Sequence, residues 1–257
     1  MHTNQLPIAV VDSGVGGISV LRELVRLMPG ENYLYYGDSA NAPYGTKPVQ
    51  QVRELTLSVA EMLMQRGIKA LVVACNTATS AAIDALREKY PHCIIVGIEP
   101  ALKMAADLFS KGNIGVMATP VTLREEKFSH QAERFPEANL FRIPAPGLVE
   151  LIEQGKADSE DTRQLLEALL APYRGKLDAL VLGCTHYPFA AKQIAAVLGP
   201  DTLLLDGSAG TARQTQRCLE NAGLLLAGPG SVQMENSSAD PEILALSMKL
   251  LQEGSHG

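Results

Sequence analysis

Two short apolar runs in this chain end in the same way, at a cysteine followed by small polar residues. The first runs from Leu71 to Cys75, and the second runs from Leu180 to Cys184. A short apolar run that stops at polar residues is typical of a strand buried in a parallel sheet. Because ligands bind beyond the carboxyl ends of such strands, both cysteines are predicted to lie at functional edges.

The pattern around each run extends the similarity along the chain. Expected strands alternate with expected helices, and a strand pattern beginning near Ile8 returns near Ile114, 106 positions later. The two cysteines are 109 positions apart. This near-constant offset predicts an α/β fold of two similar doubly wound α/β/α domains with mainly parallel sheets. A pseudo-two-fold duplication would relate the domains, with the active site in the cleft between them.

The rest of the sequence pattern predicts the other strands, helices and loops. Strands are predicted at Ile8–Val11, Tyr33–Tyr36, Cys93–Ile98, Asn113–Thr119, Thr202–Leu205 and Ser231–Met234, helices at Pro48–Arg66, Ala209–Ala222 and Pro241–Gln252, and loops at Ser39–Pro48 and Ile143–Gly147. Further helices are expected to follow both cysteines directly and to include Glu150 and Glu153.

Composition narrows the class of protein. A chain of 257 residues with 46% hydrophobic and 19% charged residues suits one large or two small globular domains. Its longest apolar runs are strand-sized, and Met1–Pro7 lacks a signal-peptide core, so we expect a cytoplasmic protein without a membrane partner. The net charge of −6 disfavours nucleic acid as a partner. An anionic ligand would therefore need local hydrogen-bond donors.

Cysteine usage argues against a disulfide framework or a metal site. The cysteines are Cys75, Cys93, Cys184 and Cys218, and neither their spacing nor that of the histidines suits zinc. In a reducing compartment they are expected to be free thiols. We interpret Cys93 and Cys218 as small buried hydrophobes.

Cys75 and Cys184 suggest acid/base chemistry. A cysteine between a strand end and a helix start meets backbone amides and the positive end of the helix dipole, which favour the thiolate. Two thiols on opposite sides of one cleft suit removal of a proton from one face of a carbon and return to the other. Asp12 near the first thiol and His186 near the second would assist. Stereochemical inversion at an acidic carbon fits this arrangement.

Uncharged donors accompany the thiols at the expected strand ends. Together with helix N-terminal amides they would hold a carboxylate without arginine; they are Ser13, Asn76, Thr77, Thr119, Thr122 and Thr185. The glycines after Ser13, with Asp38 further on, also suggest a dinucleotide site. That alternative is disfavoured because Ser19 replaces the third glycine and Asp12 would repel a pyrophosphate.

Five motifs in order resemble those of bacterial glutamate racemases, over nearly the whole chain. They are Asp12–Gly17, Tyr36–Asp38, Pro43–Gly45, Ala74–Ala78 and Gly183–Pro188. The resemblance implies cofactor-independent interconversion of L- and D-glutamate, which supplies D-glutamate for peptidoglycan. It implies a first domain of residues 1–97 and 207–257 with a second, 98–206, inserted in it. Glutamate would be the small-molecule partner, and a homodimer is left open.

The resemblance also implies residue roles. Cys75 and Cys184 would each transfer the α-proton on one face, assisted by Asp12, Glu153 and His186. The residues expected to contact substrate are Asp12, Ser13, Tyr44, Gly45, Asn76, Thr77, Thr119, Thr122, Thr185 and His186. Glu150 is interpreted as solvated helix surface, and Asp206–Ser208 receives no role. The N-terminus lacks the extension of members activated by a peptidoglycan precursor, so that regulation is not expected.

Other functions remain as alternatives. A racemase of the same superfamily would act on aspartate or a hydantoin. A thiol redox protein would form a Cys75–Cys184 disulfide, and an amino-acid binding protein would keep all function in a Cys75→Ser variant. A pyridoxal-phosphate enzyme is disfavoured because no lysine stands at a strand end beside phosphate-binding glycines.

Overall fold

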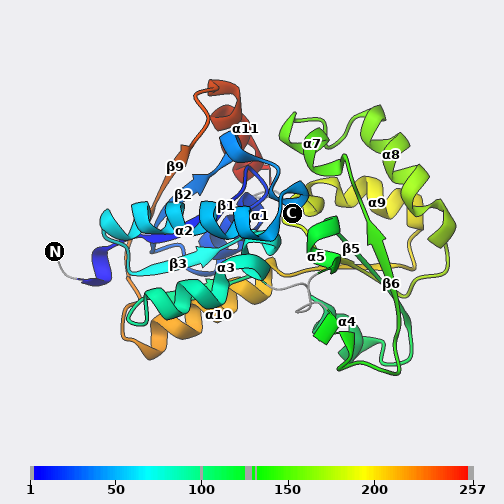
Figure 1. Cartoon of the computed structure of the whole chain (residues 1–257), viewed down its shortest axis with the longest axis horizontal. Helices are drawn as coiled ribbons and strands as arrows, with labels where there is room; N and C mark the ends of the chain where they lie inside the picture. Colours follow the sequence, from blue (N-terminus) through cyan, green and yellow to red (C-terminus); the bar gives the residue numbers. More distant parts are fainter. Residues whose placement is uncertain (1–2, 99–100, 125–128, 131, 254–257) are drawn as a thin grey trace. The chain divides into compact units, whose positions relative to one another are not determined.

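The alternating pattern folds into two parallel sheets, one built from β1–β4 and β9 and the other from β5–β8 (Figure 1). The structure is a computed structural model that describes residues 3–98, 101–124, 129–130 and 132–253. The chain divides into two compact units. Unit 1 comprises residues 1–98 and 208–257, and unit 2 comprises residues 99–207. The α/β class with two parallel sheets, predicted from the alternation, is confirmed.

Unit 1 contains a five-stranded parallel sheet in the order β4-β3-β1-β2-β9. Its strands are β1 (Ile8–Asp12), β2 (Asn32–Gly37), β3 (Ala70–Val73), β4 (Ile94–Gly97) and β9 (Ser231–Asn236). Its helices are α1 (Ile18–Leu27), α2 (Val49–Gln65), α3 (Asn76–Lys89), α10 (Ser208–Asn221) and α11 (Pro241–Gln252), with 3₁₀ turns at Thr3–Gln5, Ser39–Asn41 and Tyr44–Thr46.

Both faces of this sheet are covered, which explains why its central strands are continuously apolar. Alternate side chains such as Val11 and Leu34 join one core cluster with α2 and α3. Tyr33, one residue from Leu34, points to the other face, where its hydroxyl donates to the Leu24 carbonyl of α1. Every residue of β1 and β3 is buried, so these strands form the interior of the unit.

Unit 2 contains a four-stranded parallel sheet in the order β6-β5-β7-β8. Its strands are β5 (Asn113–Ala118), β6 (Asn139–Pro144), β7 (Ala179–Leu182) and β8 (Leu203–Asp206). Its helices are α4 (Leu102–Leu108), α5 (Pro120–Arg124), α7 (Leu148–Glu153), α8 (Glu160–Leu170) and α9 (Ala191–Leu198), with 3₁₀ turns at Ala171–Tyr173 and Tyr187–Ala190.

The two sheets share one strand order. In unit 1 the run β4-β3-β1-β2 corresponds position by position to β8-β7-β5-β6 in unit 2, and β9 is an addition. In each unit the opening strand pairs with the strand that leads to the cysteine, β1 with β3 and β5 with β7. The repeated sequence pattern therefore corresponds to a repeated topology.

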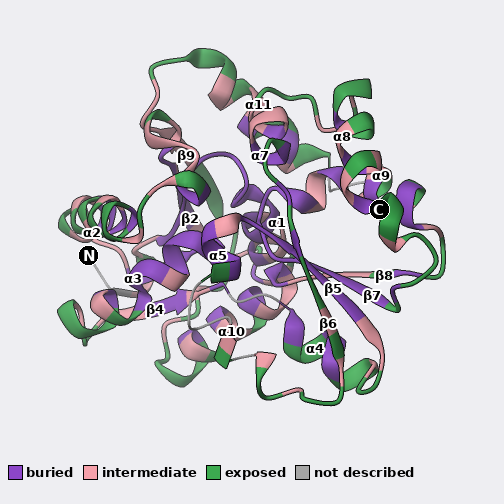
Figure 2. Ribbon diagram, turned by 45° about the vertical axis from the view of Figure 1, so that its right-hand side comes forward, coloured by how far each residue is buried: buried purple, intermediate pink, exposed green. Residues whose placement is uncertain are grey.

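Two local expectations were wrong. The segment from Ile143, predicted as a loop, begins inside β6, an edge strand whose side chains are mostly exposed and so show no apolar run (Figure 2). The helix expected directly after Cys184 starts as a 3₁₀ turn, and α9 begins only at Ala191. Pro188 lies in that 3₁₀ turn, and its ring is tolerated only near a helix start.

The helices are of the length found in globular domains. The 17 residues of α2 include five buried side chains along one stripe, while its other face carries charged and polar groups. Within the described ranges, we find no helix long and apolar enough to cross a membrane.

Candidate active site

Cys75 lies between β3 and α3. It is the N-cap residue of this 14-residue helix, and its Sγ accepts a hydrogen bond from the Ala78 N–H at 3.4 Å. The side chain is buried, with 6% of the residue exposed. A sulfur at the N-terminus of a helix meets unpaired amides and the positive end of the dipole, so this position favours a negative charge.

A buried carboxylate and a buried hydroxyl accompany this thiol. Asp12 ends β1, next to β3, and its Oδ1 accepts from the Gly14 N–H at 2.9 Å and from Ser13 Oγ at 3.4 Å. Ser13 Oγ lies 3.7 Å from Cys75 Sγ. A methyl group added at Gly17 would lie 2.6 Å from Asp12 Cβ, so a glycine lets α1 start against the carboxylate. Ser13 thus connects Asp12 to the thiol.

Tyr44 belongs to the same group through Asp38, a residue that the sequence analysis considered only for the disfavoured dinucleotide site. Its hydroxyl donates to Asp38 Oδ2 at 2.6 Å, and Asn41 Nδ2 lies 3.1 Å from both Asp38 oxygens. Burial, then the hydrogen bond to Asp38, then the negative charges of Asp38, Cys75 and Asp12 raise the pKa of Tyr44 far above its ordinary value. Tyr44 therefore stays a neutral phenol whose proton is directed at Asp38.

Two further predicted residues lie in the first turn of α3. Asn76 and Thr77 are buried directly after Cys75. The Asn76 Oδ1 atom is buried and has no hydrogen-bond partner among the described residues. An unpaired buried carbonyl oxygen is costly, so this atom is suited to accept a hydrogen bond from a bound ligand. Gly45, in the 3₁₀ turn with Tyr44, is also buried.

In unit 2 the second thiol begins a chain of three side chains. Cys184 Sγ lies 3.6 Å from His186 Nδ1, and His186 Nε2 lies 2.6 Å from Glu153 Oε1. The histidine side chain is 2% exposed and the glutamate 16%. Glu153 is the last residue of α7, so it reaches the histidine from a segment 33 residues earlier.

The electrostatics of this chain favour a charged histidine. Burial by itself lowers the pKa of His186, but the hydrogen bonds to Cys184 and Glu153 and the charges of both outweigh it and raise the pKa well above the ordinary value. The imidazole thus carries a proton at neutral pH. An imidazolium beside a thiol stabilises the thiolate.

The predicted threonines of unit 2 are also buried. Thr119 follows β5, and its Oγ1 lies 3.0 Å from Thr122 Oγ1 and accepts from the Thr122 N–H at 3.2 Å. Thr185 is buried between Cys184 and His186 in sequence. Because β5 and β7 are neighbours and parallel, these hydroxyls and the thiol follow the carboxyl ends of adjacent strands.

The predicted site residues thus form two groups, each at the carboxyl edge of one sheet. The group in unit 1 comprises Asp12, Ser13, Tyr44, Gly45, Cys75, Asn76 and Thr77, and the group in unit 2 comprises Thr119, Thr122, Glu153, Cys184, Thr185 and His186. Asp38 is the residue that sequence reasoning missed. Its place after β2, next to β1, was the available signal, since Asp12 ends the neighbouring strand.

Replacing Glu153 with glutamine is expected to lower the pKa of His186, because the variant loses a carboxylate partner. Because the pKa of His186 is higher in the folded state, protonation of this histidine stabilises the fold. The stabilisation is complete below about pH 6.5, the pKa of a histidine in the unfolded chain, and it is lost as the pH rises through the folded-state pKa. At pH 6 we expect the variant to lose about 2 kcal/mol of unfolding free energy. Histidine NMR titration and denaturant unfolding measure both effects. Glu150→Gln, in the same helix, is the control; an unchanged His186 pKa in Glu153→Gln would contradict the arrangement.

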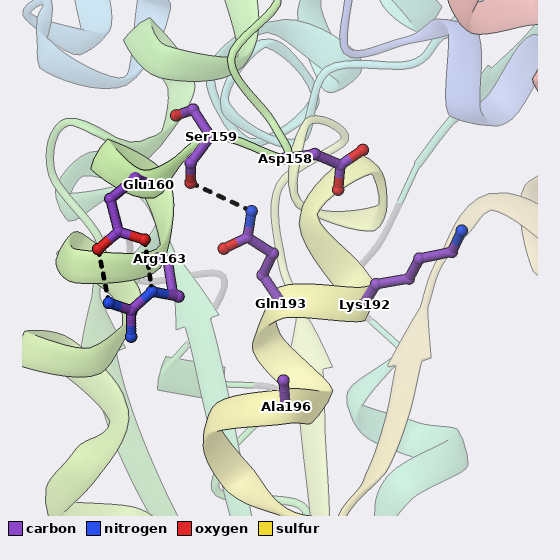
Figure 3. A pocket seen from close by; sticks show the side chains of 7 residues that line it. All are labelled: Asp158, Ser159, Glu160, Arg163, Lys192, Gln193 and Ala196. Carbon is purple, nitrogen blue, oxygen red and sulfur yellow. Dashed lines mark hydrogen bonds and ion pairs between the residues drawn. The ribbon is translucent and has the colours of Figure 1, made fainter.

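A surface pocket of unit 2 lies apart from these groups (Figure 3). It lies between α8 and α9, and its Glu160 and Arg163 form a bidentate ion pair. Gln193 Nε2 donates to the Ser159 carbonyl at 3.2 Å. No predicted site residue lines it. In the described part of the chain, we also find no group of three His, Cys, Asp or Glu side chains placed to hold a metal ion.

The fold and the two groups define an α/β enzyme with buried thiols as its acid/base candidates. The family described as Asp/Glu/Hydantoin racemase matches residues 8–215. The chain belongs to this family, and is therefore an isomerase.

Individual relatives resemble the chain over nearly its full length. Glutamate racemase from Clostridium acetobutylicum is 50% identical over 255 residues, which cover 98% of this chain and 99% of the relative. The crystal structure of Escherichia coli glutamate racemase with L-glutamate and the activator UDP-MurNAc-ala has a TM-score of 0.85 at 30% identity, covering 96% and 95%. That of Francisella tularensis glutamate racemase with D-glutamate has a TM-score of 0.84 at 26% identity, covering 97% and 94%.

Proposed function

We propose that this protein interconverts L- and D-glutamate without a cofactor, with Cys75 and Cys184 as the two proton carriers. The observation that carries the proposal is the pair of buried thiols at equivalent places of two repeated sheets, each beside its own acidic or basic helper. The similar racemases that hold D- and L-glutamate support glutamate as the substrate.

The proposed reaction is a proton transfer in two steps. One thiolate takes the α-proton from one face of glutamate, and the electron pair of the broken C–H bond stays on the carbon. The other thiol then gives its proton to the opposite face. The protonation states of the two thiols are exchanged at the end of a turnover, so the next turnover in the same direction needs exchange with solvent.

The helpers differ between the two thiols. Asp12 would assist Cys75 through Ser13, whose hydroxyl lies within 3.7 Å of the sulfur. His186, held by Glu153, would stabilise the Cys184 thiolate as a charged imidazolium. The enzyme would thus use a carboxylate on one side and a histidine–carboxylate pair on the other.

Substrate binding would rely mainly on uncharged groups. Asn76 Oδ1, buried and unpaired within the described residues, suits a hydrogen bond donated by the α-ammonium group. The other proposed contacts are Ser13, Tyr44, Gly45, Thr77, Thr119, Thr122, Thr185 and His186, with Asp12 beside them. Local donors are needed because the net charge of −6 would not attract an anionic amino acid.

The proposal extends to the setting of the reaction. D-Glutamate made by this protein would supply peptidoglycan synthesis in the cytoplasm. The two compact units would be the folding domains, with the second inserted in the first. Sedimentation velocity tests for a homodimer, which the resemblance leaves open.

Solvent exchange tests the proposed reaction directly. In deuterium oxide, L-glutamate is expected to yield D-glutamate with deuterium at the α-carbon, without added cofactor and with reduced thiols. NMR detects the lost α-proton and circular dichroism detects the change of enantiomer. Aspartate is run beside glutamate as the control for a sister activity. Failure of glutamate to racemise or exchange would refute the proposal, and faster aspartate turnover would redirect it to that substrate.

The two alternative classes of protein, a thiol redox protein and an amino-acid binding protein, predict different results in these experiments. A thiol redox protein would lose function on reduction, whereas the racemase needs both thiols free. A binding protein would bind glutamate without exchanging its α-proton.

A further inference from the structure

Two tyrosines on one face of β2 form hydrogen bonds to backbone carbonyls near the two ends of α1. Tyr33 and Tyr35 are both buried, and their alternation places both on the face that packs against this helix. The Tyr33 hydroxyl donates to the Leu24 and Met28 carbonyls, both at 2.9 Å, at the end of α1. The Tyr35 hydroxyl donates to the Gly14 carbonyl at 2.6 Å, just before α1 begins.

The turn held by Tyr35 also carries the carboxylate of the Cys75 group. Gly14 donates its N–H to Asp12 Oδ1 at 2.9 Å while its carbonyl accepts from Tyr35. A methyl group added at Gly37 would lie 2.7 Å from the same carbonyl oxygen, so β2 passes close to it. The two peptide units that contain Gly14 are thus bound at opposite ends, one by Asp12 and the other by Tyr35.

We propose that Tyr35 is a positioning residue for the Cys75 proton carrier and that it acts through Gly14 and Asp12; this rests on the proposed racemase function. Glycine has a wide range of backbone conformations, so a glycine next to a catalytic carboxylate needs an external restraint. Tyr35 supplies it through one short hydrogen bond, and Ser13 connects the carboxylate to the sulfur.

The test compares Tyr35→Phe with Tyr33→Phe. Each variant removes one buried phenol hydroxyl from the same face of the same strand, but only the first hydroxyl contacts the turn beside Asp12. We expect Tyr35→Phe to lower kcat/KM about fivefold and Tyr33→Phe to lower it by less than about twofold. Melting temperatures show whether both variants are folded at the assay temperature.

Substrate deuterium isotope effects separate positioning from general destabilisation. Enantiomers have equal free energies, so any variant must change kcat/KM equally in both directions. The isotope effect measured with α-deuterated substrate can differ between the two enantiomers. If Tyr35 serves the Cys75 centre, the effect should rise only for the enantiomer whose α-proton Cys75 removes. A loss of folded protein would change neither effect.

The outcomes are distinct. Racemisation by the unsubstituted protein, with a one-sided rise in Tyr35→Phe and none in Tyr33→Phe, supports the positioning role. Equal losses in the two variants, or isotope effects that rise for both enantiomers, would overturn it while leaving the racemase function in place. No racemisation by the unsubstituted protein would overturn the proposed function itself, and this role with it.

Discussion

Replacement of Cys75 or Cys184 by serine is expected to lower kcat/KM for glutamate racemisation by at least about a thousandfold. A serine hydroxyl is a far weaker acid than a thiol, so it neither forms the anion that removes the α-proton nor returns a proton readily. Inversion needs both carriers, so each single change should block both directions. Circular dichroism of each pure enantiomer over time measures the loss.

The chain provides its own controls for this experiment. Cys93 and Cys218 are half-buried free thiols outside both groups. Cys93 Sγ faces the Ile94 carbonyl at 3.6 Å, and burial raises the pKa of this thiol. Serine at either position should leave kcat/KM within about twofold of the unsubstituted protein. A Cys75→Ser or Cys184→Ser variant that keeps a tenth of the activity would refute the two-thiol mechanism.

Replacement of Lys69 by methionine should destabilise unit 1 by about 3–5 kcal/mol, because it leaves the buried Glu31 without its cation. Lys69 Nζ lies 2.5 Å from Glu31 Oε2, and the side chains are 0% and 1% exposed. The ammonium also donates to the carbonyls of Asn4 and Leu224. Three segments distant in sequence therefore lose bonds at once.

Thermal unfolding followed by circular dichroism measures this loss, with an expected fall in melting temperature of roughly 10 °C. Lys89 and Glu61 form an ion pair of 2.9 Å on the surface, with side chains 46% and 53% exposed. Lys89→Met is the matched control and should shift the melting temperature by less than about 2 °C. Similar melting-temperature shifts in the two variants would show that burial of the Lys69–Glu31 pair does not increase its contribution to stability.

The elements that sequence reasoning placed correctly share a physical cause. β1 and β3 are buried on both faces, so selection of apolar side chains at every position leaves a continuous pattern. The polar residue after each strand marks the sheet edge, which is how Asp12 and Cys75 were recognised. By contrast, β6 has mostly exposed side chains. Its pairing with β5 depends on backbone hydrogen bonds, which require no periodic pattern of apolar residues in the sequence.

The helpers show where sequence reasoning stopped. Glu153 was included only through the family resemblance, because its contact with His186 joins segments 33 residues apart. Asp38 was considered for a nucleotide site, yet it accepts a hydrogen bond from Tyr44. Tyr35 read as an ordinary strand residue. Each of these contacts is made by a side-chain tip whose target is set by packing of another element.

The sequence by itself determined the α/β class, the repeat of the strand pattern and the places of both thiols after strands β3 and β7. These features follow from local periodicity and from residue order, which need no knowledge of distant contacts. Only the tertiary structure decided how each helper reaches its sulfur, with the Ser13 hydroxyl between Asp12 and Cys75, and with His186 between Glu153 and Cys184. The reason is geometric, since a hydrogen bond requires atoms about 3 Å apart, and the folding of the chain brings them to that distance.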